Sequence, residues 1–230
     1  MQGSHDVQTP PLRADARRNR EQIIEAAREL FIRVGTDVPM EEIAKTAGVG
    51  VGTLYRRFPD RDELIKAVSL DNFARLLEVA RRIEREETDP AAALSTLLYS
   101  SLELRLGITM TAVSPRSYEA MQRSIEHSTQ RDEVLKIASR LLHRAQEAGT
   151  MRKDIDIGDV VLALVLVSRL LPPTDDELGD MVYRRLIALM MDGLRATAVS
   201  PLPGRPIAYQ DIQALRMTGF GKPGAPAGSR

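Results

Sequence analysis

The sequence contains no cysteine, no tryptophan and no long hydrophobic run. Without cysteine the chain has no disulfide, no thiolate metal site and no cysteine nucleophile, and its composition suits a reducing compartment. The longest apolar run, Val160–Val167, is far shorter than the ~20 residues that a membrane span needs. The first residues also lack the apolar core of a signal peptide. These absences predict a cytoplasmic protein with no membrane partner.

Neither the histidines nor the glycine-rich segment of the sequence indicates a catalytic site. The three histidines, His5, His127 and His143, do not have the spacing of a zinc motif such as HExxH. The glycines from Gly48 to Gly52 lack both the preceding strand and the Lys-Thr pair of a phosphate-binding loop. No nucleophile elbow is found. A small helical enzyme is therefore a weak alternative, and we expect neither a metal nor a cofactor.

The residues that are present predict an all-α fold. Aromatic residues make up 4% of the 230 residues and hydrophobic residues 43%, so the core is expected to consist mainly of Leu, Ile, Val, Ala and Met. Such a core suits a helical bundle. The charges balance, with 32 Lys plus Arg against 32 Asp plus Glu. A nucleic-acid-binding surface would therefore have its positive charge concentrated on one face.

Two short helices separated by a tight turn are predicted in the first third of the chain. Pro39 and the two acidic residues after Met40 suit the start of a helix over Met40–Thr46, and Gly48 provides the turn. The second helix, Val51–Arg57, follows so closely that the two must meet at a steep angle, as in a helix-turn-helix. A helical hairpin with a solvated basic end is the plainer alternative.

The second of these helices is predicted to read DNA. An α-helix fits the major groove, where arginine makes bidentate hydrogen bonds to guanine and hydroxyl groups bind phosphates. Arg56 and Arg57 are the predicted base contacts, and Val51 is placed against a thymine methyl group. Thr53 and Tyr55 are the predicted phosphate contacts. The full DNA-facing set is Val51, Gly52, Thr53, Tyr55, Arg56 and Arg57.

A resemblance to a known family runs through this segment. Ile43–Ile65 reads IAKTAGVGVGTLYRRFPDRDELI, which is similar to the DNA-binding segment of the TetR family of bacterial transcriptional regulators. The likeness extends from about Arg17 to Ala67. It implies an all-helical repressor or activator that works as a homodimer. The family usually has a phosphate-contacting Lys where this chain has Arg61, so the resemblance implies that role for Arg61.

Two positions depart from the family pattern. Val38 stands where members often have Thr, so Pro39 and Asp37 must help to define the start of the first short helix. Gly50 stands where many members have Ser, and glycine is an acceptable helix cap. We therefore expect the helix geometry to survive, while a hydroxyl group that could contact phosphate is absent.

Four segments are predicted along the chain: an N-terminal flexible arm over 1–12, the helix-turn-helix domain over 13–67, a helical effector-binding and dimerisation domain over 68–199, and a mobile Pro- and Gly-rich tail over 200–230. Apolar periodicity and stop signals predict helices over 15–34, 61–86, 91–106, 118–127, 131–148, 157–171 and 175–198. Asp60 and Glu63 have the spacing of a helix cap. An arginine cluster that includes Arg17 either makes a phosphate or minor-groove contact with DNA or is a solvated tail.

The last two predicted helices, about 157–171 and 175–198, are the expected dimer interface. The first is apolar nearly all round, and the second has an apolar stripe. Burial of both helices within one monomer is the alternative. A two-fold operator needs two recognition helices spaced ~34 to 36 Å apart, which favours the homodimer. In the TetR family the corresponding pair packs against its two-fold mate as a four-helix bundle.

The resemblance also implies an effector. In the family a small molecule enters a pocket among the helices of the effector-binding domain and changes the separation of the two DNA-binding domains of the dimer. The predicted pocket residues are the polar or soft side chains on apolar helices: Tyr99, Arg105, Met110, Tyr118, Met121, Gln122, His127 and His143. Each has a structural alternative, since Met and Tyr at helical spacing are usually core residues.

The apolar surroundings of these residues favour a hydrophobic or amphipathic ligand. We therefore predict a ligand-responsive repressor that binds a palindromic DNA operator as a homodimer. An adaptor or a DNA-associated dimer without an effector is the alternative.

Overall fold

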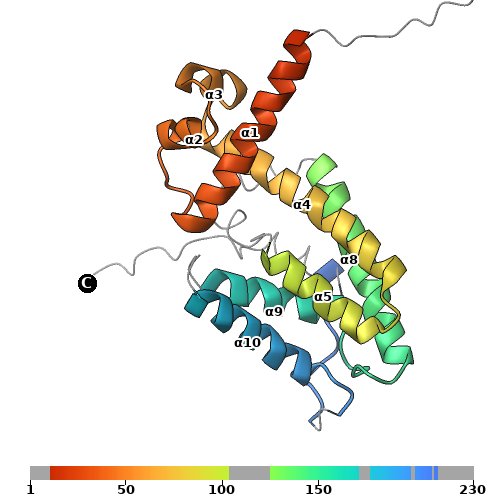
Figure 1. Ribbon diagram of the computed structural model, residues 1–230. Helices are drawn as coiled ribbons and strands as arrows, with labels where there is room; N and C mark the ends of the chain where they lie inside the picture. The colour runs from red at the N-terminus through yellow and green to blue at the C-terminus, as the bar shows by residue number, and fades with distance from the viewer. Residues whose placement is uncertain (1–10, 104–124, 171–176, 198–199, 209, 212–230) are drawn as a thin grey trace, which may run out of the picture.

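The computed structural model describes residues 11–103, 125–170, 177–197, 200–208, 210 and 211 (Figure 1). Within these residues the chain forms α-helices and one isolated antiparallel bridge. The helices are α1 Pro11–Arg33, α2 Met40–Thr46, α3 Val51–Arg57, α4 Arg61–Glu86, α5 Pro90–Glu103, α8 Ile125–Glu147, α9 Ile157–Leu170 and α10 Glu177–Gly193. The predicted all-α fold class is confirmed. No helix among the described residues is long and apolar enough to cross a membrane.

The helices form a head and a body that share α4. Figure 1 shows α1, α2 and α3 grouped at one end of the molecule, with α4 running from this head into the body formed with α5, α8, α9 and α10. The head core contains Ile23, Phe31, Ile43, Leu54 and Leu64, among others. The body core begins on α4 at Leu76 and includes Leu94, Leu141 and Ile187. Because α4 contributes to both cores, it is the mechanical link between them.

The boundaries of the short head helices agree with the sequence prediction. The Glu63 amide donates to Asp60 Oδ1 at 2.8 Å, so the predicted cap of α4 is formed. The start of α1 differs, because the helix begins at Pro11 rather than at residue 15. Proline suits a first helical turn, and this explains the earlier start. Residues 1–10 of the predicted arm lie outside the described residues.

A buried arginine joins α1 to α4 in the head. The Arg28 side chain is 8% exposed, and its Nε donates to Asn72 Oδ1 at 2.8 Å. Its terminal nitrogens bind Glu25 and Asp71, and Arg75 bridges the same two carboxylates at 2.7 and 2.8 Å. Burial opposes ionisation of Glu25, but hydrogen bonding and the charge of Arg28 outweigh it and lower the pKa of Glu25. This network lies between the head and body portions of α4.

The body helices depart from the predicted boundaries at two places. The helix predicted over 131–148 is α8, which already begins at Ile125, and residues 118–124 of the separate helix predicted before it lie outside the described residues. The last helix, α10, ends at Gly193 rather than near residue 198. The chain leaves the helix there because the Arg152 amide donates to Leu194 O at 3.0 Å and the Ala196 amide donates to Thr150 O at 3.1 Å.

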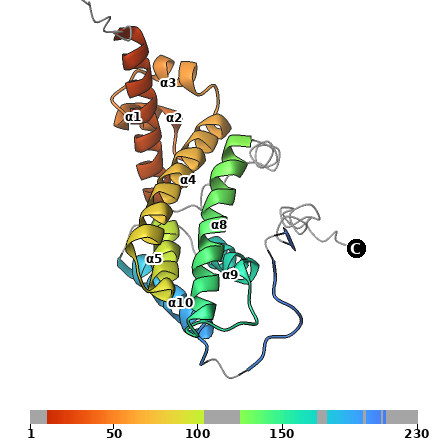
Figure 2. The same ribbon diagram turned by 90° about the vertical axis from the view of Figure 1, so that its right-hand side faces the viewer.

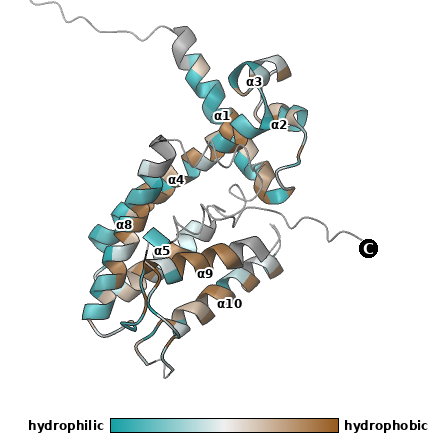
Figure 3. Cartoon of the chain, turned by 180° about the vertical axis from the view of Figure 1, so that it is seen from behind, coloured by the Kyte–Doolittle hydropathy of each residue, from teal (hydrophilic) through white to brown (hydrophobic). Residues whose placement is uncertain are grey.

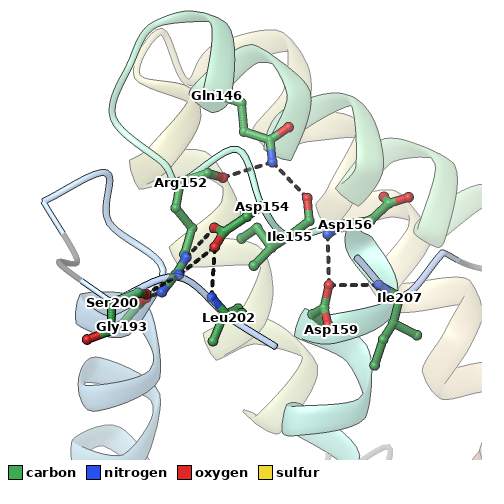
Figure 4. Close-up of polar contacts among 10 residues, drawn as sticks. All are labelled: Gln146, Arg152, Asp154, Ile155, Asp156, Asp159, Gly193, Ser200, Leu202 and Ile207. Atoms are coloured by element: carbon green, nitrogen blue, oxygen red, sulfur yellow. Dashed lines mark hydrogen bonds and ion pairs between the residues drawn. The ribbon is translucent and has the colours of Figure 1, made fainter. Parts of the chain in front are cut away.

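The segment 200–208 of the predicted tail, which we call the C-terminal strap, contacts the body through hydrogen bonds. The strap returns from α10 to the connector between α8 and α9 (Figure 4). The Leu202 amide donates to Asp154 Oδ2 at 3.1 Å, and the Ile207 amide donates to Asp159 Oδ2 at 3.0 Å. Carboxylates on the body thus accept backbone hydrogen bonds from this segment. Residues 212–230 lie outside the described residues.

Candidate nucleic-acid interface

The corner between α2 and α3 forms the base of the candidate interface. Gly48 has a φ of 67°, in the left-handed region that favours glycine, and this lets the chain turn directly after α2. The Val49 amide then donates to Ala44 O at 3.0 Å. Ile43 and Leu54 are both fully buried and pack in the head core, so the two helices are fixed in their relative orientation.

One side of α3 faces outward, as predicted. Leu54 is the buried residue of this helix, while Val51 and Tyr55 are 40% and 42% exposed. Gly52, Arg56 and Arg57 are exposed as well, and Thr53 is half-buried. The helix contains two arginines and no acidic residue. The predicted residues therefore share one positively charged and solvent-facing surface.

Arg56 is held over its own helix. Its Nη2 donates to Thr53 Oγ1 at 3.1 Å, one turn earlier in α3. A guanidinium has five N–H donors, and this contact uses one of them. The bond restrains the side chain close to the exposed side of the helix.

Arg61 contacts the protein backbone. Its Nη1 donates to Thr36 O and, at 2.6 Å, to Val38 O, both in the loop before α2. The family resemblance implied a phosphate contact for this residue. The side chain ties the first turn of α4 to the loop that leads into the helix-turn-helix. The phosphate contact of Arg61 stays a prediction.

Arginines on α1 add charge beside the helix-turn-helix. Arg17 is 78% exposed and lies 3.7 Å from Glu21 in an i,i+4 pair. The Arg20 guanidinium carbon lies 5.7 Å from the centre of the Phe58 ring, at the end of α3. That distance is typical of a cation–π contact. The contact joins the basic segment of α1 to the end of α3.

A second exposed surface is apolar and lies on α9 and α10. Figure 3 shows hydrophobic residues along α9 and on α10, which pack side by side. On α10 Leu178, Met181 and Leu189 are 63%, 48% and 64% exposed, and helical periodicity puts them on one face. On α9 Val165 and Leu166 are 37% and 51% exposed. We call these five residues the apolar face. Large exposed apolar patches on soluble proteins often mark a surface that binds a partner.

Only part of the predicted effector pocket can be placed. Arg105, Met110, Tyr118, Met121 and Gln122 lie outside the described residues, as does the side chain of His127. Tyr99 packs against the body core from α5, and its hydroxyl donates to Arg184 O of α10 at 3.3 Å. His143 is exposed on α8, with Nδ1 3.3 Å from Gln146 Oε1. This exposure removes His143 from our candidates for an enclosed site.

The described residues contain no group of three or more His, Asp or Glu side chains that could hold a metal ion. The carboxylates that do gather, such as those around Arg28 and Arg152, are instead paired with arginine. The exposed side of α3 can bind a partner through hydrogen bonds and positive charge.

Comparison with known proteins fits this arrangement. The family profile of the bacterial regulatory proteins of the tetR family matches residues 23–68, and that of the C-terminal domain of SbtR-like transcriptional regulators matches residues 89–196. A TetR transcriptional regulator from Streptomyces coelicolor, of known crystal structure, is 30% identical with a TM-score of 0.56, and the match covers 78% of this chain and 99% of that one. The chain belongs to the TetR family. Because that is a family of regulators, the enzyme alternative is set aside.

Other TetR-family relatives differ in how much they share with the chain. A TetR transcription regulatory protein from Mycobacterium vanbaalenii is 31% identical, with 80% of this chain and 99% of that chain covered and a TM-score of 0.53. An HTH-type transcriptional regulator from Staphylococcus aureus is 46% identical over 54 residues. That match covers 23% of this chain and 29% of the relative, so the chain spans less than a third of this curated relative. The strap, residues 200–208, lies beyond both matched profiles.

Sequence reasoning missed the role of Arg28 in this TetR-family head. The signal was present in the sequence, because Arg28 falls on the same helical stripe as Ile24 and Phe31, which are buried. A charged residue within an apolar stripe indicates a buried partner. Its partners on α4 are more than forty positions away in the sequence, so their identity needed the fold.

Proposed function

We propose that this chain is a transcriptional repressor that binds a palindromic operator as a homodimer. The observation that carries the proposal is the exposed face of α3, with Arg56 and Arg57 on a helix that has no acidic residue. Family membership supports regulation of transcription by DNA binding. The apolar face on α9 and α10 supports the homodimer, because a second copy of the chain would bury it. A two-fold operator also needs two DNA-binding domains.

The residues of the interface are given different roles. Arg56 and Arg57 read base edges, and Val51 contacts a thymine methyl group. Thr53 and Tyr55 bind phosphates through their hydroxyl groups, and Arg17 adds a charged contact from α1. Gly52 lets the start of α3 approach the duplex closely because it has no side chain. A Cβ at this position would meet no protein atom within 4 Å and would point toward the DNA.

The proposal includes a small hydrophobic or amphipathic effector that binds in the body and weakens operator binding. The link is α4, whose first turns lie in the head core and whose later turns lie in the body core. A displacement of the body end of α4 therefore moves α3. The effector shifts the population only if it binds the non-operator state more tightly than the operator-bound state. Tyr99 is the pocket candidate that faces the body core.

The test is a titration of the protein into the intergenic DNA upstream of its own gene and into a scrambled fragment of equal length. Fluorescence anisotropy at several salt concentrations measures both affinities. We expect the native fragment to bind at least ~10³ times more tightly, with an affinity that falls steeply as salt rises. Equal, weak binding to this fragment and to a library of genomic fragments would contradict the proposal and favour the adaptor alternative.

A prediction about Arg61 separates support of the head from contact with DNA. Arg61→Ala is expected to weaken operator binding without changing the slope of log K against log salt, because the side chain donates to Thr36 O and Val38 O. Loss of one phosphate contact from each protomer would instead reduce that slope by about 2. The same titrations at four or more salt concentrations give the slope.

Arg17→Ala is the matched control, because Arg17 is an exposed arginine of the same head whose described partner is Glu21. This variant is expected to reduce the salt slope by about 2, because the homodimer loses one phosphate contact of about 1 from each protomer. A thermal melt should show a lower Tm for Arg61→Ala and an unchanged Tm for Arg17→Ala. If the slope falls equally in both variants, Arg61 is a phosphate contact after all.

A further inference from the structure

The C-terminal strap, residues 200–208, docks where three body helices meet. Figure 2 shows the blue chain after α10 running along the outside of the body beside α9, and Figure 4 shows its contacts with the α8–α9 connector. Gln146 of α8 holds this connector by donating from Nε2 to Arg152 O at 3.0 Å and to Ile155 O at 2.9 Å. The surface that receives the strap is therefore itself fixed to α8.

Arg152 is the first anchor of the strap. Its Nε and Nη2 pair with the two carboxylate oxygens of Asp154 at 2.6 and 2.7 Å, and Nη2 also donates to Ser200 O at 2.8 Å. Asp154 in turn accepts from the Leu202 amide at 3.1 Å. The same arginine donates from Nη1 to Gly193 O, at the last turn of α10, at 3.3 Å. The strap and the end of α10 are thus held by one side chain.

Asp159 is the second anchor, in the first turn of α9. Its Oδ2 accepts from the Asp156 amide at 2.9 Å, which closes the start of the helix. It also accepts from the Ile207 amide at 3.0 Å. A single carboxylate oxygen therefore serves both the cap of α9 and the strap, so the strap is bound directly to a dimer helix.

Gly158 fits the strap closely. A Cβ placed on Gly158 would lie 2.0 Å from Ile207 O and 2.6 Å from Ile207 C. No side chain fits at such distances, so only glycine at this position lets the strap lie against α9. The close approach is to backbone atoms, which a change of rotamer cannot relieve.

We propose that the connector and the first turn of α9 form a docking groove for the chain's own residues 200–208, and that docking holds α9 and α10 in the arrangement that forms the dimer. The strap contacts the start of α9, and Arg152 contacts both the strap and the end of α10. Undocking therefore loosens both helices that carry the apolar face. The dimerisation step rests on the proposed function, whereas docking of the strap does not.

The test is Gly158→Ala in the full chain, with Gly193→Ala as the matched control. Alanine is the better helix former, and a Cβ at Gly193 in α10 meets nothing within 4 Å. Gly193→Ala is therefore expected to leave Tm unchanged or to raise it. Gly158→Ala is expected to lower Tm despite its higher helix propensity, because the new methyl group displaces Ile207.

Hydrogen exchange followed by mass spectrometry separates undocking from unfolding. We expect the Leu202 and Ile207 amides to be protected in the native chain and to lose that protection in Gly158→Ala, while α4 and α8 stay protected. The dimer dissociation constant from analytical ultracentrifugation should rise about tenfold, the effect of losing one or two hydrogen bonds.

Two results would overturn the inference. If Gly158→Ala raises Tm as Gly193→Ala does and the strap amides exchange rapidly in the native chain, the groove is not occupied in solution. If the strap undocks but the dimer dissociation constant is unchanged, the coupling to dimerisation is wrong. Neither result bears on operator binding, which the titration of the native chain tests separately.

Discussion

Leu189→Glu is expected to convert the homodimer into a monomer and to abolish specific operator binding. Leu189 is 64% exposed on α10 and lies on the same helical face as Leu178 and Met181. In the proposed dimer this face is buried, so the variant would place a carboxylate without a partner in an apolar interface. Such burial costs several kcal/mol, enough to separate a typical dimer at micromolar concentration.

The loss of the dimer is expected to weaken binding to the operator. A monomer presents one reading head to an operator built from two half-sites, so its affinity is expected to fall by a factor of ~10³ or more, toward that for random DNA. Sedimentation velocity gives the oligomeric state, and the operator titration gives the affinity. Far-UV circular dichroism should be unchanged, because the replaced side chain is exposed in the monomer.

Val34→Glu is the control for the charge change. Val34, after the end of α1, is 60% exposed, close to the value for Leu189, but lies in the head rather than on the apolar face. This variant is expected to sediment as a dimer. If Leu189→Glu remains a dimer at low micromolar concentration, the apolar face is not the dimer interface and the alternative of a different dimer surface takes its place.

The head could be predicted from sequence because its boundaries depend on local signals. Pro39 before α2, Gly48 after it and the Asp60 cap before α4 act within a few residues, and the structure has α2, α3 and α4 at the predicted bounds. The outward face of α3 follows from the buried position of Leu54, since helical periodicity then turns its neighbours outward.

What sequence reasoning missed depends on contacts between residues that are distant in the chain. Arg61 meets the carbonyl groups of Thr36 and Val38, a contact that the spacing of motifs does not reveal. The contacts of the strap were not predicted either, since Asp154 and Asp159 accept hydrogen bonds from its backbone amides. In each case a hydrogen bond to backbone atoms, which have no sequence signature, decides the position.

Arg56→Ala is expected to remove most of the preference for the operator over random DNA. A bidentate contact to guanine is worth ~1 to 3 kcal/mol, and a homodimer carries two copies, so the loss on the full operator is ~2 to 6 kcal/mol. The side chain is exposed on α3 and is restrained by its bond to Thr53 Oγ1, so its removal leaves the head core intact. Anisotropy titrations on operator and random DNA measure the ratio of affinities.

Tyr55→Phe separates reading of bases from binding of phosphates. It removes one hydroxyl group from a residue that is 42% exposed and keeps the aromatic ring. We expect it to weaken binding to operator and random DNA by the same factor, because phosphates carry no sequence information. Arg56→Ala should instead weaken operator binding far more than random binding. Equal losses on the two DNAs for Arg56→Ala would show that Arg56 contacts the backbone and would leave Arg57 and Val51 as the remaining candidates for base readout on α3.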